Sequence, residues 1–143
     1  MRHALLLVAT LLAAAPAQAA PPQVLGVLTI KVEKVSPRGG DVRVALYDRD
    51  DYAGDQPAVV DAVVPARTGE TIVVLPAVKP GIYAVKLFQD FNRNGQFDMS
   101  WIGLPLEKYG FSNDARPTFA EPPFDATKFE LRAGANTITI HLQ

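Results

Sequence analysis

The sequence predicts an all-β protein, an antiparallel β-sandwich of immunoglobulin or transthyretin-like type with about seven strands. Apolar and polar residues alternate with a period of two over several short segments, which is typical of half-buried strands. Glycine and proline separate these segments at short intervals, as turn residues do. After the first nineteen or so residues, no segment has the periodicity of a convincing amphipathic helix.

The N-terminal segment predicts export. Met1-Arg2-His3 is positively charged, residues 4–15 carry no charge, and Ala17-Gln18-Ala19 has the small-x-small pattern of a signal peptidase site. The apolar run is about twelve residues long, whereas a membrane-spanning helix needs about 20. We therefore expect a signal peptide over 1–19, a single β-sandwich domain over 20–143, and a location in the periplasm or outside the cell. No later stretch is long and apolar enough to span a membrane.

The composition excludes several functions. The chain has 143 residues, with 14 Lys+Arg against 15 Asp+Glu, and removing Arg2 with the signal makes it slightly more acidic. A near-neutral chain without a basic cluster is a poor candidate for binding nucleic acid or anionic membranes. The chain has no cysteine, and His141 is the only histidine after cleavage. A cysteine–histidine nucleophile or a zinc site of the Cys/His type therefore cannot be built.

The strands are expected in a regular order along the chain. Residues 25–34 and 41–47 alternate cleanly and flank a turn rich in glycine and proline, so they should form a hairpin. Residues 58–64 and 70–75 follow. Pro80-Gly81 then leads into 82–89, which is apolar on both faces and suits a central strand, while Tyr83 should tether this corner. The last two strands are expected over 127–132 and 137–142.

A long loop, residues 90–126, is expected between strands six and seven. It is rich in proline, glycine, asparagine and aromatic residues. A connection of this length inside a compact domain is usually functional or carries structure of its own.

The sharpest pattern in this loop resembles the front of a calcium loop. Ca²⁺ takes about six to eight oxygen ligands, and oxygen-bearing side chains fall at loop positions 1, 3, 5 and 9, with glycine at position 6. Position 7 would offer its backbone carbonyl. An EF-hand has glutamate at position 12, where this chain has Trp101, so a site here should be weak unless Glu107 or Asp114 joins it. The candidate metal ligands are Asp90, Asn92, Asn94, Gln96 and Asp98.

A purely structural turn explains the same residues equally well. Asn94-Gly95 is a favoured two-residue hairpin turn, and Asn and Asp side chains bond their own backbone in turns. Phe91 and Phe97 would then be cross-strand partners. The sequence leaves both interpretations open.

A second cluster in the loop is a candidate ligand surface. Mixtures of aromatic and amide side chains suit contact with sugars or peptides, and loops on a sandwich often carry binding. The alternative, which the sequence favours, is that these aromatic residues, with Phe119, form a small core beneath the loop. The candidate residues are Trp101, Glu107, Tyr109, Phe111 and Asn113.

The order of these motifs resembles a known family. Pro80-Gly81-x-Tyr83-Ala84-Val85 is followed by Asp90-x-Asn92-x-Asn94-Gly95-x-x-Asp98, then by Gly103-x-Pro105-x-Glu107-x-Tyr109-Gly110-Phe111-Ser112-Asn113 and by Pro122-Pro123-Phe124. This order resembles the exported bacterial family called domain of unknown function 2141. The resemblance implies a periplasmic or secreted β-sandwich and implies no activity.

The residues therefore favour an exported, non-enzymatic binding or interaction module whose long loop is organised by Ca²⁺ or by a turn. Its ligand would be a small molecule, a sugar or a protein, and the sequence does not identify it. The alternative is a periplasmic hydrolase that acts on a sugar or peptide through loop carboxylates such as Asp98 and Glu107. Paired acids from distant positions leave no local signature.

Overall fold

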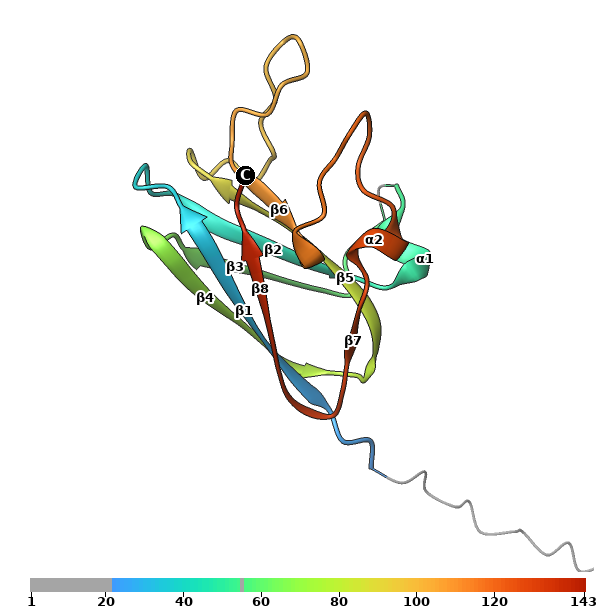
Figure 1. Cartoon of the computed structure of the whole chain (residues 1–143). Helices are drawn as coiled ribbons and strands as arrows, with labels where there is room; N and C mark the ends of the chain where they lie inside the picture. The colour runs from blue at the N-terminus through green and yellow to red at the C-terminus, as the bar shows by residue number, and fades with distance from the viewer. Residues whose placement is uncertain (1–21, 55) are drawn as a thin grey trace, which may run out of the picture.

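Two β-sheets pack face to face in the computed structural model, which describes residues 22–54 and 56–143 (Figure 1). The expected signal peptide lies outside the described residues. Within them the elements are β1 (Gly26–Val35), β2 (Asp41–Tyr47), α1 (Arg49–Tyr52), β3 (Val60–Pro65), β4 (Gly69–Val78), β5 (Gly81–Asp90), β6 (Tyr109–Phe111), the 3-10 turn η1 (Ser112–Asp114), α2 (Phe124–Thr127), β7 (Phe129–Leu131) and β8 (Gly134–His141).

The smaller sheet has the strand order β4-β1-β8 and the larger one β3-β2-β5-β6, with β7 pairing to β5 beside this path. β1 is antiparallel to β4, whereas β1 and β8 are parallel, with Ile30 opposite Ile138. In the larger sheet all pairs are antiparallel. The parallel pair of the first and last strands departs from the antiparallel sandwich that the sequence predicted.

The core lies between the sheets and comes from alternate positions of the strands. Leu28, Ile30 and Val32 of β1 are fully buried, and they pack in one cluster with residues of both sheets. Burial of every second residue removes one face of each strand from water, and this is the main stabilising contribution to such a fold. The all-β prediction is confirmed. The narrower immunoglobulin or transthyretin type stays a prediction.

The corner before β5 is formed as expected. The Tyr83 hydroxyl donates a hydrogen bond of 3.0 Å to the carbonyl of Lys79, so this tyrosine closes the turn at Pro80-Gly81. Burial raises the pKa of Tyr83, with a smaller contribution from Asp48, so its hydroxyl stays protonated as a donor.

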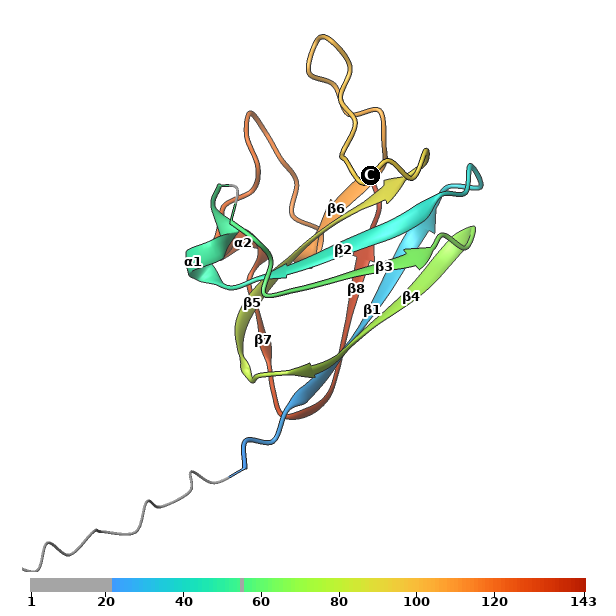
Figure 2. The same cartoon turned by 180° about the vertical axis from the view of Figure 1, so that it is seen from behind.

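The long segment differs from its prediction in place and in content. It follows the fifth strand rather than the sixth, and it holds β6 as well as short helical turns. Figures 1 and 2 show the chain between β5 and β6 extending beyond the end of the sandwich. The segment 115–123 extends from the same end. Among the described residues, no helix is long and apolar enough to cross a membrane.

Candidate binding groove and long loop

The outer face of the five-stranded sheet is hollowed into a groove of about 340 Å³, called here the outer groove. Ala45 of β2 lies at its floor because its neighbours in register are Asp61 of β3 and Lys86 of β5. A methyl group at this central position leaves room that a larger side chain would fill. The next residue across the sheet, opposite Lys86, is Phe111 of β6.

Aromatic rings form one wall of the outer groove. Phe88 and Tyr109 are paired across β5 and β6, and Phe97 from the long loop packs on both of them, with ring centroids 5.5 and 5.6 Å away. Phe111 continues the series at 6.0 Å from Tyr109. All are edge-to-face contacts, the arrangement that the charge distribution of aromatic rings favours. The rings are only partly buried, so they offer apolar surface to a ligand.

Lys86 is held firmly at the other end of the groove. Its ammonium lies 2.5 Å from a carboxylate oxygen of Glu121 and donates a 2.7 Å hydrogen bond to the carbonyl of Tyr52. It also lies over the rings of Tyr47 and Tyr52, at 4.7 and 4.2 Å from their centroids. Burial, followed by the charge of Glu121 among other contributions, raises the pKa of Tyr47. The groove therefore presents neutral rings and a paired lysine, with the carboxylate of Asp61 also in its lining.

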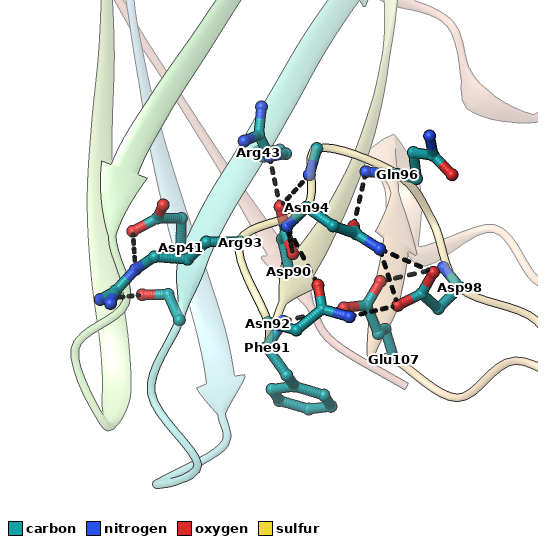
Figure 3. Close-up of polar contacts among 12 residues, drawn as sticks. Asp41, Arg43, Asp90, Phe91, Asn92, Arg93, Asn94, Gln96, Asp98 and Glu107 are labelled. Carbon is teal, nitrogen blue, oxygen red and sulfur yellow. Dashed lines mark hydrogen bonds and ion pairs between the residues drawn. The ribbon is translucent and has the colours of Figure 1, made fainter.

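Asp90 ends β5 and anchors the loop that follows it. Its carboxylate is fully buried and accepts from Arg43 Nε at 2.7 Å and from the backbone amides of Gly95 and Asn94 at 2.9 and 3.1 Å (Figure 3). Burial alone would raise the pKa of Asp90, but the bonds from Arg43 and the two amides together hold it below its ordinary value. Arg43, on the outer face, is thereby paired as well.

The rest of the loop is closed by its own side chains. Asn92 and Asn94 donate through Nδ2 to the carboxylate of Asp98 at 2.7 and 3.0 Å, so these three residues converge (Figure 3). The Oδ1 atoms of the two asparagines accept from the backbone amides of Asn94 and Gln96. The Gln96 side chain points away from the cluster in Figure 3. The expected Asx turns are therefore present.

The calcium prediction is not tested by these contacts. Within the part of the chain that the structure describes, no group of three or more Asp, Glu, His or Cys side chains is placed to hold a metal ion. Both oxygens of Asp90 already have donors, one of them the Arg43 cation, and the amide nitrogens of Asn92 and Asn94 face Asp98. A bound ion would require both amides to rotate, so that oxygen faces it. Calcium binding stays a prediction.

Glu107 has a structural position. It is 5% exposed, and its two oxygens accept from the backbone amides of Phe91 at 2.8 Å and Asp98 at 3.1 Å (Figure 3). The alternative of a hydrolase using Asp98 and Glu107 requires two carboxylates that face a common cleft. The carboxylate of Glu107 instead closes the base of the long loop.

The remaining candidate residues have three kinds of position: in the outer groove, in hydrogen bonds to the backbone, and on exposed loops. Tyr109 and Phe111 line the outer groove. Asn113 donates to the carbonyls of Ala126 and Lys128 and holds the segment before β7. Trp101 is 96% exposed and Phe119 is fully exposed, so the small core expected beneath the loop is wrong for these two residues.

The sequence analysis did not single out most of the residues that line the outer groove. Ala45, Lys86 and Phe88 come from strands whose outward positions alternate regularly with buried ones. That alternation could have indicated an aromatic and a lysine on the same outer face of β5. It gives no information on Phe97 and Glu121, which come from two separate loops.

The comparisons with known proteins identify one family. Residues 30–139 match the model of a family described as "Uncharacterized protein conserved in bacteria (DUF2141)". No curated protein and no solved structure matches the chain.

Proposed function

The chain belongs to the bacterial family DUF2141, and on this premise we propose that it is an exported binding module whose ligand occupies the outer groove. The observation that carries the proposal is the groove itself: aromatic rings on one side, Ala45 at the floor, and a volume of about 340 Å³. Small-molecule sites typically have about 300–1,000 Å³ and are mostly apolar, with few polar groups. Export rests on the N-terminal sequence pattern of residues 1–19.

The charges around the groove disfavour an anionic ligand. The charges of both cations are already compensated, Arg43 by Asp90 through Nε and Lys86 by Glu121, and the lining also holds the carboxylate of Asp61. An anionic ligand would meet cations that are already neutralised, would face the carboxylate of Asp61 and would lose its own hydration. A ligand with an apolar face and neutral hydroxyl or amide groups, such as a sugar or a short peptide, meets no such cost.

The test uses an uncharged fluorescent probe, N-phenyl-1-naphthylamine, with the chain over residues 20–143. We expect saturable binding by the wild type. Ala45→Leu puts three extra carbon atoms over the groove floor, so probe binding should weaken at least about fivefold, since overpacking costs about 1–3 kcal/mol. Loss of probe binding in this variant with an unchanged melting temperature supports the groove.

The matched control is Thr29→Leu. Thr29 is half-buried on β1, the central strand of the other sheet, and has the outward parity. It therefore places a leucine on the outward face of the other sheet without changing the groove. Equal probe affinity in the wild type and Ala45→Leu would rule out the outer groove as the binding site. Equal losses in both variants would indicate a general effect on the sandwich.

A further inference from the structure

The turn between β5 and β6 carries an exposed apolar surface that the outer groove does not use. Residues 99–106 have the sequence Met-Ser-Trp-Ile-Gly-Leu-Pro-Leu and are called here the apolar tip. Trp101 is 96% exposed, and Ile102, Leu104 and Leu106 are each more than half exposed. The tip carries no charge between Asp98 and Glu107. Contiguous exposed apolar side chains of this size mark contact sites.

The shape of the tip is that of a projection. Met99 and Pro105 pair as an isolated antiparallel bridge, which makes the segment a narrow hairpin. Figures 1 and 2 show it reaching beyond the end of both sheets. Because the hairpin projects, it can contact another molecule or surface while the two sheets stay in place. The segment 115–123, with fully exposed Phe119, extends from the same end.

The backbone of the tip is partly paired by hydrogen bonds within the hairpin and at its base. The amides of Ser100 and Gly103 donate to the carbonyls of Leu104 and Ser100 at 2.7 and 2.9 Å. The amide of Leu104 donates to Ser100 Oγ at 2.9 Å, and that of Leu106 to the carbonyl of Asp98 at 2.9 Å. Pro105 has no amide hydrogen. Unpaired backbone groups make entry into the hydrocarbon core of a bilayer costly, and the groups of the tip that stay unpaired restrict it to the hydrated interfacial layer.

We propose that the apolar tip inserts into the interfacial layer of a phospholipid bilayer and holds the domain at a membrane surface. An indole ring prefers the boundary between headgroups and acyl chains, and leucine and isoleucine prefer the region just below it. The tip has no cationic residue, so the attraction does not depend on anionic lipid. This agrees with the near-neutral composition, which excludes a purely electrostatic attachment.

The experiment uses Trp101 as its own reporter, because it is the only tryptophan of the chain. The chain over residues 20–143, which contains every described strand, is mixed with vesicles of phosphatidylcholine. Trp101 emission should move to shorter wavelength and be quenched by brominated acyl chains. Binding should be similar at low and high salt, because charge plays no part in it.

Two variants separate tip insertion from other contacts. Leu104→Asp keeps Trp101 and should lower the partition coefficient at least about tenfold, since aspartate is strongly disfavoured in lipid. Ile72→Asp, on an exposed position of β4, is the matched control and should bind as the wild type does. Leu104→Asp should also retain the binding of the naphthylamine probe in the outer groove, which keeps this test independent of the proposed function.

Three results would overturn the proposal. One is an unchanged Trp101 spectrum at saturating lipid. Another is equal partitioning of the wild type and Leu104→Asp. The third is a spectral shift that appears without vesicles as protein concentration rises, accompanied by a larger sedimentation coefficient, which would assign the tip to contacts between copies of this chain.

Discussion

Replacement of Asp90 by asparagine tests whether the long loop is held by the contacts of one buried carboxylate. Asp90 accepts from Arg43, Gly95 and Asn94 and is fully buried. Asparagine has nearly the same shape but offers a single acceptor oxygen and carries no charge. Asp90→Asn therefore removes the ion pair with Arg43 and leaves at least one of the three donors without a partner.

The size of the effect follows from the exposure of the two partners. Removing one member of a fully buried ion pair costs about 3–5 kcal/mol, whereas an exposed pair contributes about 0–1 kcal/mol. The Arg43 side chain is 29% exposed, so water partly compensates it in the variant. We expect Asp90→Asn to lower the free energy of unfolding by about 2 kcal/mol. For a domain of this size, that lowers the melting temperature by about 8 °C.

The assay is thermal unfolding of both proteins between pH 3 and pH 7. Because the folded pKa of Asp90 is lowered, its contribution is fully present above the unfolded pKa of about 4 and is lost as pH falls through the lower folded value. The difference between wild type and Asp90→Asn should therefore be constant near neutrality and shrink in acid.

Asp41→Asn is the matched control, since Asp41 is opposite Asp90 in register and pairs with the exposed Arg93 at 3.1 Å. Asp41→Asn should lower the free energy of unfolding by no more than about 0.5 kcal/mol. The reasoning fails if the two variants lose the same stability at pH 7, or if the Asp90→Asn difference persists unchanged at pH 3.

Three further predictions concern the same end of the molecule. Glu107→Gln keeps one acceptor for the two amides of Phe91 and Asp98, so chemical denaturation should show a loss of about 1–2 kcal/mol. In the same assay Gly40→Ala should lower the free energy of unfolding by about 3 kcal/mol, and Gly39→Ala by about 1 kcal/mol. Both glycines have a positive φ, but only at Gly40 would a Cβ meet the Asp90 carbonyl, at 2.1 Å. Because the carboxylate oxygens of Asp90 and Asp98 already have protein donors, EDTA and millimolar Ca²⁺ should give the same melting temperature. A rise with Ca²⁺ that Asp98→Asn abolishes would show instead that the loop rearranges around an ion.

The strands could be predicted because each shows its burial in its own sequence. Leu28, Ile30 and Val32 alternate with polar residues, and such a pattern fits a strand with one buried face whatever its neighbours are. The alternation within a strand does not show which other strand it pairs with. The parallel pairing of β1 with β8 joins residues more than a hundred positions apart, such as Ile30 and Ile138, and periodicity carries no information about it.

The candidate site was predictable only where it is local. The oxygen spacing from Asp90 to Asp98 identified a closed loop, and the contacts of Asn92 and Asn94 with Asp98 lie within it. The outer groove combines outward residues of four strands with Phe97 and Glu121 from two loops, so no window of the sequence contains it. For Trp101 the difficulty is different, because residue type favours burial and only the tertiary structure shows exposure.

The segment between β5 and α2 reverses the usual placement of residue types, and this argues that it is maintained for function. Its buried anchors are polar: Glu107 binds two backbone amides, and Ser112 accepts from the amide of Val85 and donates to the carbonyl of Thr127. Its large apolar residues, Trp101 foremost, face water. Stability alone would favour the opposite arrangement, since burying these side chains is favourable and burying carboxylates is costly. Polar anchors fix the backbone while leaving the apolar side chains free, which is what a rigid contact surface requires.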